Sequence, residues 1–278
     1  MTIPPCADRS LPAAWRAAAL RITPGFESTG DPYRAVEGSF DGMGLSCGVL
    51  QWNLGQGSLQ PLIRAVGKDH VCTAMPNHGA RLWAACQSGN GSAVRALAKA
   101  WHKARRLDPL VRKELAALMS TPAMRAQQDK AIDAVAQAAA GQADAWARAA
   151  GRGAASLHEF AWFFDLVTQN GSLKGVTFGD VGAMIAAHGK TGAPAYICNE
   201  LAAMAGATGH AADARRNGAL WREATSEIAR ELLVASWLRA GKARAEWRAV
   251  VLNRKGTIAM GKGWVNSGRF DLLALLAG

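Results

Sequence analysis

The chain lacks the features of disulfide-bonded, metal-binding and membrane-spanning proteins. Its 278 residues include five cysteines, an odd number without a CxxC pair, which excludes a disulfide scaffold and a cysteine-based zinc site. Its six histidines show neither HExxH nor any other ligand spacing, so we expect no metal and no cofactor. No apolar run is long enough to cross a bilayer, and we expect no membrane span.

The start of the sequence also lacks the pattern of a signal peptide. Positions 1–10 contain two prolines and an aspartate, and the apolar stretch that follows is interrupted by Arg16 and Arg21. We therefore expect synthesis in the cytoplasm without a cleaved leader.

Acidic residues are scarce relative to basic ones. Lys and Arg number 32 against 21 Asp and Glu, which gives a formal net charge of +11 and a pI near 9.9. This charge favours a polyanionic partner, either nucleic acid, an anionic membrane surface or the carboxylate-rich bacterial wall. Charge alone does not choose among them.

Apolar residues recur at helical spacing through most of the chain and make up half of it, enough for one large or two-lobed domain. The expected helices span residues 11–22, 58–66, 80–86, 92–104, 109–119, 121–150, 156–167, 179–188, 194–205, 213–239 and 243–253. The segment 156–167 is apolar almost all round, which predicts a buried central helix. Asp165 within it would be costly to bury alone, so we expect a partner such as an arginine. Gly151-Arg152-Gly153 is the best candidate for a boundary between lobes.

A carboxylate followed by a glycine-punctuated stretch sets residues 27–57 apart. Glu27 follows the first helix, Asp41 lies among glycines that favour tight turns, and an expected strand with Gln51 and Asn53 comes next. Two carboxyl groups beside one small hairpin are what glycoside hydrolysis requires, one kept protonated by apolar neighbours such as Phe26 and one kept ionised. The spacing of fourteen residues leaves room for a water and favours inversion. On spacing alone, both carboxylates also fit solvated turn residues.

The residues of this stretch resemble a known superfamily. Glu27-Ser28 and Gly48-Val49-Leu50-Gln51 resemble the Glu-Ser and Gly-Leu-Met-Gln elements of goose-type lysozymes and soluble lytic transglycosylases. The string from Phe40 to Leu59 is similar to lysozyme-like proteins among phage endolysins and secreted antibacterial muramidase effectors, which are distant relatives of chitosanases. The match covers about residues 11–66 and resumes weakly at 160–174 and 254–272. Residues 67–155 carry no recognisable motif.

This resemblance implies an α-rich (α+β), two-lobed lysozyme-like fold with a small β-hairpin wall beside the cleft. It implies one catalytic domain over residues 1–278, with a hairpin lobe at about 11–66 and a helical lobe at about 78–278. The implied activity is hydrolysis of the β-1,4 bond between N-acetylmuramic acid and N-acetylglucosamine in peptidoglycan. Such a protein would reach the periplasmic wall through a phage holin or a secretion machine, and an immunity protein is a further possible partner.

The resemblance also implies roles for single residues. Glu27 matches the general acid, and Asp41 falls where goose-type enzymes hold the attacking water. Asn53 stands where some relatives have a second aspartate, which leaves water activation to Asp41 or Asp31. The expected substrate contacts are Ser28, Gln51, Asn53, Gln169, Asn170, Arg254, Lys255 and Thr257.

The stretch 254–263 is expected to be a glycine-rich turn or hairpin that closes the cleft. Its GxxxxGK spacing is that of a phosphate loop, but Gly263 stands where a magnesium-binding Ser or Thr would be needed, so we expect no nucleotide site.

Three alternatives to the muramidase remain open. Lytic transglycosylases share the two sequence elements but lack a partner carboxylate, so Asp41 favours hydrolysis. A chitosanase would act on a polycation, which suits a basic protein poorly. A basic binding module for wall polymer or nucleic acid would need no paired carboxylates, whereas for the enzyme we expect no nucleic-acid ligand.

Overall fold

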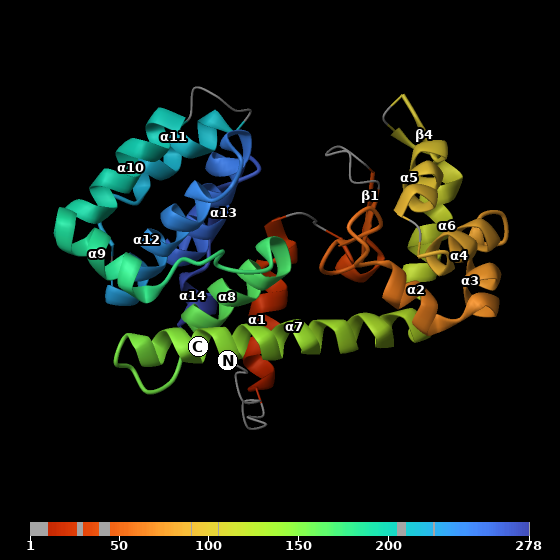
Figure 1. Ribbon diagram of the computed structural model, residues 1–278, viewed down its shortest axis with the longest axis horizontal. Helices are drawn as coiled ribbons and strands as arrows, with labels where there is room; N and C mark the ends of the chain where they lie inside the picture. Colours follow the sequence, from red (N-terminus) through yellow and green to blue (C-terminus); the bar gives the residue numbers. More distant parts are fainter. Residues whose placement is uncertain are drawn as a thin grey trace. The chain divides into compact units, whose positions relative to one another are not determined.

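The computed structural model describes residues 11–26, 30–38, 45–89, 91–104, 106–204, 210–224 and 226–277. The fold is α-rich with only small antiparallel strand pairs, as the sequence predicts. The chain divides into two compact units, a larger unit of Met1–Glu27 and Val135–Gly278 and a smaller unit of Ser28–Ala134. Helix α7 (Pro122–Ala149) contributes residues to both (Figure 1).

The larger unit is built around α8 (Leu157–Asn170). Ser156 and Glu159 form a capping box at its start, and the residues from Phe160 to Leu166 are all buried, which confirms the predicted central helix. Helices α1, α12, α13 and α14 pack against α8. The remaining elements of the unit are α1 (Ala13–Ile22), η1 (Pro24–Phe26), α9 (Phe178–His188), α10 (Gly192–Met204), α11 (Ala211–Leu220), α12 (Glu227–Gly241), η4 (Ala245–Trp247), α13 (Arg248–Met260), β6 (Lys262–Val265), β7 (Gly268–Asp271) and α14 (Leu273–Leu276).

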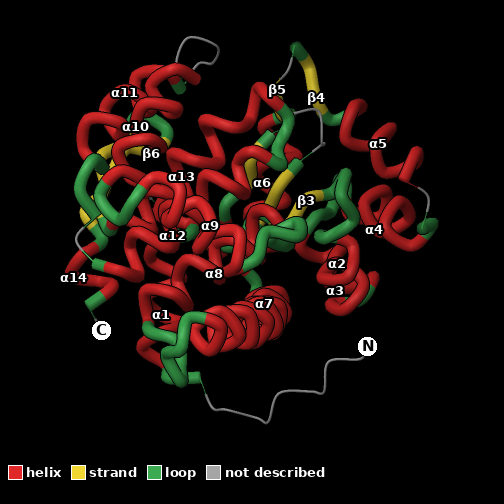
Figure 2. The backbone as a smooth tube through the Cα atoms, turned by 60° about the vertical axis from the view of Figure 1, so that its left-hand side comes forward, coloured by secondary structure: helices red, strands yellow, loops and turns green. Residues whose placement is uncertain are grey.

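Two predicted elements of the larger unit are wrong. The single helix expected over 213–239 is divided into α11 and α12, because Trp221 leaves the helix, packs against α13 and donates its indole N–H to the Lys262 carbonyl at 2.7 Å. The turn expected from residue 254 is helical as far as Met260, where Gly261 ends α13 with a φ of 68°. Only the part after it is a hairpin, β6–β7, which lies beside α13 (Figure 2).

The smaller unit combines short helices with a small sheet. Its helices are α2 (Gln60–Val66), α3 (Lys68–Ala74), α4 (Gly79–Gln87), α5 (Gly91–Ala100) and α6 (Pro109–Ser120), with η2 (Pro32–Arg34) before the sheet. Strands β1 (Val36–Glu37), β2 (Ser46–Cys47) and β3 (Trp52–Asn53) form an antiparallel sheet in that order, and β4 (His102–Lys103) pairs with β5 (Arg106–Leu107). Ser58, which lies just before α2, accepts a hydrogen bond from the backbone N–H of Asn53 and does not cap that helix.

The boundary expected at residues 151–153 lies inside the larger unit. Gly151-Arg152-Gly153 ends α7, and Arg152 is bound by Glu159 and Glu231, so this turn is fixed by its own unit. The contact division falls instead next to Glu27 and inside α7, near residue 134. Among the described residues no helix is long and apolar enough to cross a membrane.

Candidate functional site

The expected site residues are divided between the two units. Glu27, Ser28 and Asp41 lie outside the described residues. The structure does describe the segments next to them in the chain. Gln51 and Asn53 belong to the smaller unit. The other expected contacts, from Gln169 to Thr257, belong to the larger unit.

The turn that directly precedes Glu27 is fixed at several points within the larger unit. The Phe26 carbonyl accepts a hydrogen bond from the Asn266 amide at 3.1 Å, and the Thr23 carbonyl accepts one from Arg254 at 2.9 Å. The guanidinium of Arg254 lies over the Phe26 ring, 4.9 Å from its centroid, and the Phe270 ring makes an edge contact with it at 4.7 Å between centroids. Phe26 is buried, so the chain reaches Glu27 from an anchored apolar position.

The anchoring guanidinium belongs to a buried charge cluster, which confirms the arginine partner predicted for Asp165. The Asp165 carboxylate, fully buried, pairs with Arg254 at 2.8 Å and with the Lys255 ammonium. Burial alone would raise the pKa of Asp165, but the two cations beside it hold that pKa below its ordinary value. Burial lowers the pKa of Lys255, and the Asp165 charge opposes this.

We predicted that Arg254, Lys255 and Thr257 contact the substrate. The structure instead gives each of them a position within the fold. All three are buried in α13, and the Thr257 hydroxyl donates to the Asn253 carbonyl of the same helix. They lie in the interior of the larger unit because α13 packs against α8, α11 and α12. Their observed contacts hold the fold and, through Arg254, the turn before Glu27.

Gln169 and Asn170 lie at the C-terminal end of α8. Gln169 is exposed, and Asn170 is half-buried with its carbonyl 3.5 Å from Arg239 Nη2. Arg239 also donates to the Ser172 carbonyl at 2.9 Å, so this buried cation stabilises the end of α8, where carbonyl groups carry partial negative charge.

The glycines of the 254–263 stretch have a packing role. A Cβ atom on Gly256 would lie 2.5 Å from the Trp221 ring, and one on Gly263 would lie 2.9 Å from it. Because real Cβ atoms do not approach this closely, both positions must be glycine for Trp221 to pack where it does. Of the two glycines in the phosphate-loop spacing, Gly256 is thus explained by the packing of Trp221, and Gly261 by its φ of 68° and its closeness to Leu273.

The sheet of the smaller unit has one buried row and one polar row. Val36, Cys47 and Trp52 are cross-strand partners and are all buried. Burial raises the pKa of the Cys47 thiol, as expected for a structural rather than reactive cysteine.

The polar row consists of Glu37, Ser46 and Asn53. Both polar atoms of the Asn53 side chain have partners, because its nitrogen donates to the Ser46 hydroxyl at 2.9 Å and its oxygen accepts from the Gly55 and Gln56 backbone amides. Asn53 therefore supports the loop after β3 rather than presenting a free amide.

The turn from Gly48 to Gln51 holds the motif's glycine and glutamine against α7. Gln128, fully buried, accepts from the Val49 amide at 3.2 Å and donates to the Tyr33 and Met119 carbonyls. Gln51 was predicted on a strand but lies in the turn before β3, with a φ of 54°. A non-glycine residue in this region carries backbone strain, a feature found more often at functional sites.

Gly48→Ala is expected to destabilise the protein by about 2–4 kcal/mol, combining a left-handed conformation with overpacking. Gly48 has a φ of 74°, and an added Cβ would meet the Gln128 amide oxygen, Met119 Cε at 2.7 Å and Trp52 at 2.9 Å. Gly57→Ala is the matched control, because Gly57 has a φ of 84° and nothing within 4 Å. Urea unfolding gives the free energy of unfolding of each variant. The difference between the two losses is the steric contribution at Gly48, and equal losses would contradict the packing argument.

The two described carboxylates near the sheet differ in their partners. Asp31, expected as an alternative for water activation, pairs with Arg125 and accepts from the Tyr33 amide at 3.0 Å, so both of its oxygens are engaged. Glu37 is exposed, and no hydrogen bond or ion pair holds it among the described residues. Sequence reasoning assigned Glu37 no role in catalysis or substrate binding, since strand register cannot be read from glycine-rich turns.

Within the described part of the chain, no group of three His, Cys, Asp or Glu side chains is placed to hold a metal ion. Comparisons with models of protein families, with curated proteins and with solved structures found no match.

Proposed function

We propose that the protein is a peptidoglycan hydrolase that cleaves the β-1,4 bond between N-acetylmuramic acid and N-acetylglucosamine. The observation that carries the proposal is the anchored turn at Pro24–Phe26, which leads from a buried aromatic residue directly to Glu27. A general acid must stay protonated and hold one position, and an apolar, fixed neighbour favours both. The lysozyme-like motif around Glu27 and Gly48 supports the same assignment.

In this mechanism Glu27 donates its proton to the glycosidic oxygen as the bond to the anomeric carbon breaks. Asp41 accepts a proton from the water that attacks the anomeric carbon, which yields a reducing sugar and inverts the configuration. Asp41 is preferred over Asp31, because both oxygens of Asp31 are already engaged. Once the buried residues of α13 and the hydrogen-bonded Asn53 are set aside, the proposed substrate contacts are Ser28, Gln51, Gln169 and Asn170.

Digestion of purified sacculi tests this proposal. We expect the turbidity of a sacculus suspension to fall, and mass spectrometry to show fragments that end in reducing N-acetylmuramic acid. Fragments ending in 1,6-anhydromuramic acid would assign a lytic transglycosylase instead, and cleavage of chitosan alone would assign a chitosanase. No fragments from any of these polymers would overturn the enzymatic proposal.

A further inference from the structure

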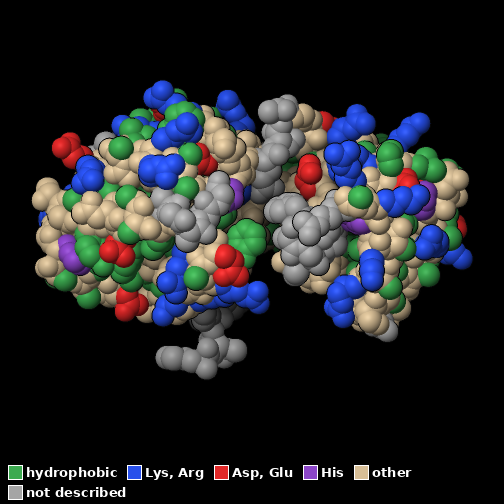
Figure 3. Space-filling view, turned by 90° about the horizontal axis from the view of Figure 1, so that it is seen from above, with side chains coloured by type: hydrophobic (Ala, Val, Ile, Leu, Met, Phe, Trp, Pro, Cys, Tyr) green, Lys and Arg blue, Asp and Glu red, His purple; other side chains and the backbone are tan. Residues whose placement is uncertain are grey.

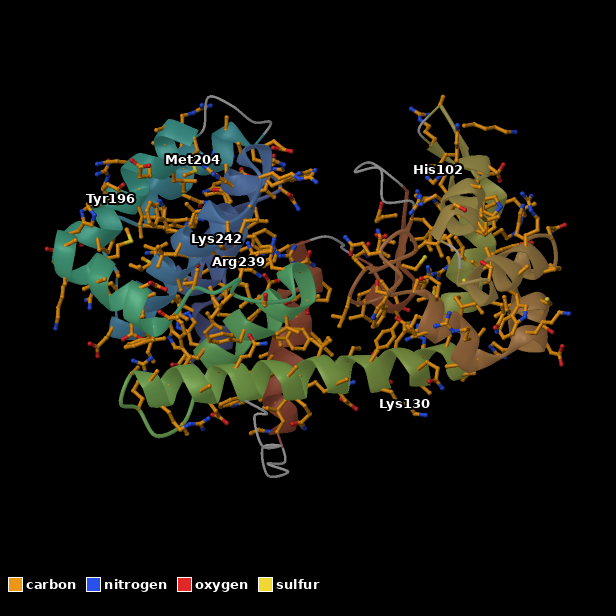
Figure 4. The ribbon with its side chains drawn as sticks, in the orientation of Figure 1. His102, Lys130, Tyr196, Met204, Arg239 and Lys242 are labelled. Carbon is orange, nitrogen blue, oxygen red and sulfur yellow. The ribbon has the colours of Figure 1, made fainter. Side chains whose placement is uncertain are left out.

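A short hairpin in the smaller unit carries a high density of positive charge. The hairpin consists of the paired strands β4 and β5, and we call its described residues, His102, Lys103, Arg106 and Leu107, the basic finger. It follows α5 and extends beyond that helix, with His102 labelled on it (Figures 1 and 4). Its strands have two residues each, so they form little of the core.

The base of the basic finger is well anchored. Trp101 and Leu107 are buried, the Asp108 amide donates to the Trp101 carbonyl at 2.8 Å, and His102 Nδ1 lies 2.7 Å from the Ala98 carbonyl. The pair Lys103 and Arg106 therefore stands next to an anchored base.

Lys103 and Arg106 are directly opposed cross-strand partners. Like charges in this position repel each other and destabilise a hairpin. Both side chains are exposed, and among the described residues neither forms an ion pair that would offset the repulsion. A local arrangement that costs stability without a structural gain is typical of a functional site.

The finger stands beside the sheet of the proposed catalytic hairpin. A Cβ atom added to Gly38 would lie 3.2 Å from His102 Nε2 and 3.6 Å from Leu107 Cβ, so the finger base contacts the end of β1. Glu37, exposed and without a partner among the described residues, precedes Gly38. A surface that mixes cations with a free carboxylate suits a polymer with widely spaced negative charges better than a polyphosphate.

We propose that the basic finger binds the free carboxylate groups of the peptide stems of the bacterial wall polymer, and so favours peptidoglycan over uncharged or cationic glycans. This inference rests on the proposed hydrolase function and assigns part of its substrate specificity to Lys103 and Arg106. Lys and Arg side chains are spread over the visible face of each unit (Figure 3), so the test must separate the finger from general charge.

Co-sedimentation with purified sacculi measures the binding, with Glu27→Gln present throughout to stop cleavage. The test variant is Lys103→Gln/Arg106→Gln. The control is Arg81→Gln/Lys113→Gln, which removes two exposed cations of the same unit. We expect the finger variant to bind about tenfold more weakly at low salt and the control to change by less than about twofold. The difference should vanish near 1 M salt, where charges are screened within a few ångströms.

Sacculi whose carboxylates are amidated provide the second arm. We expect the unaltered finger to bind them as weakly as the finger variant binds native sacculi. Equal binding of the two variants, or unchanged binding after amidation, would overturn the inference while leaving sacculus cleavage by the wild type intact. Tighter finger-dependent binding to duplex DNA than to sacculi would also overturn it. Finger-dependent binding without any wild-type cleavage would instead remove the hydrolase proposal and keep the carboxylate site.

Discussion

Glu27→Gln is expected to lower the rate of sacculus cleavage by at least about 100-fold, the lower end of what a positioned general acid contributes. The substituted amide has the size of the carboxylic acid but no proton acidic enough to donate. Initial rates of turbidity loss, checked by mass spectrometry of the released fragments, measure the effect. A variant that releases fragments at the wild-type rate would remove Glu27 from the mechanism.

The control for this substitution is Glu246→Gln, which makes the same chemical change at an exposed position of the larger unit. We expect its cleavage rate to match the wild type, and thermal unfolding of both variants to stay within about 0.5 kcal/mol of it. The turn before Glu27 is anchored through Phe26, which contacts Asn266, Arg254 and Phe270. An activity loss with unchanged stability would therefore report on chemistry rather than folding.

Most helices of the chain could be predicted from the sequence, because their signals are local. Asp108-Pro109 and Thr121-Pro122 mark the starts of α6 and α7, where proline fixes the first helical φ. The buried helix α8 follows from its apolar composition, and the cost of burying Asp165 alone indicated the arginine that the structure provides.

The errors arise where distant residues decide the outcome. Gly256 and Gly263 resemble turn residues in sequence, but they are needed where Trp221 packs against α13 and β6. The same contact divides α11 from α12, which a continuous apolar periodicity could not reveal. Arg254 and Lys255 resemble exposed substrate contacts until the partner Asp165, about ninety positions earlier, is known.

The candidate site shows the same division between local and distant signals. The motif glycine Gly48 was predictable as a turn residue, but its second requirement, the closeness of Gln128 from α7, was not. The engagement of Asp31 by Arg125 likewise depends on α7 lying beside the turn at Pro32–Arg34. Residues that support a site from other elements leave no pattern in the local sequence.

Asp165→Ala is expected to destabilise the larger unit by about 3–5 kcal/mol, the usual cost of leaving a buried charge without its partner. The substitution leaves both Arg254 and Lys255 buried beside an apolar side chain. Urea unfolding measures the loss. Asp69→Ala, at an exposed position of α3, is the control and should cost less than about 1 kcal/mol. Equal free energies for Asp165→Ala and wild type would show that the cluster carries little stability.

The triple variant Asp165→Leu/Arg254→Met/Lys255→Met separates stability from the positioning of Glu27. Replacing a whole buried ion cluster by apolar residues of similar size often restores stability, so we expect it to unfold close to the wild type. It removes the guanidinium that holds the Thr23 carbonyl and lies over Phe26. Sacculus cleavage should therefore stay at least about tenfold below wild type, since misplacing a catalytic group lowers the rate steeply. Full cleavage by a stable triple variant would show that the cluster supports the fold alone, and that Asn266 and Phe270 suffice to hold the turn.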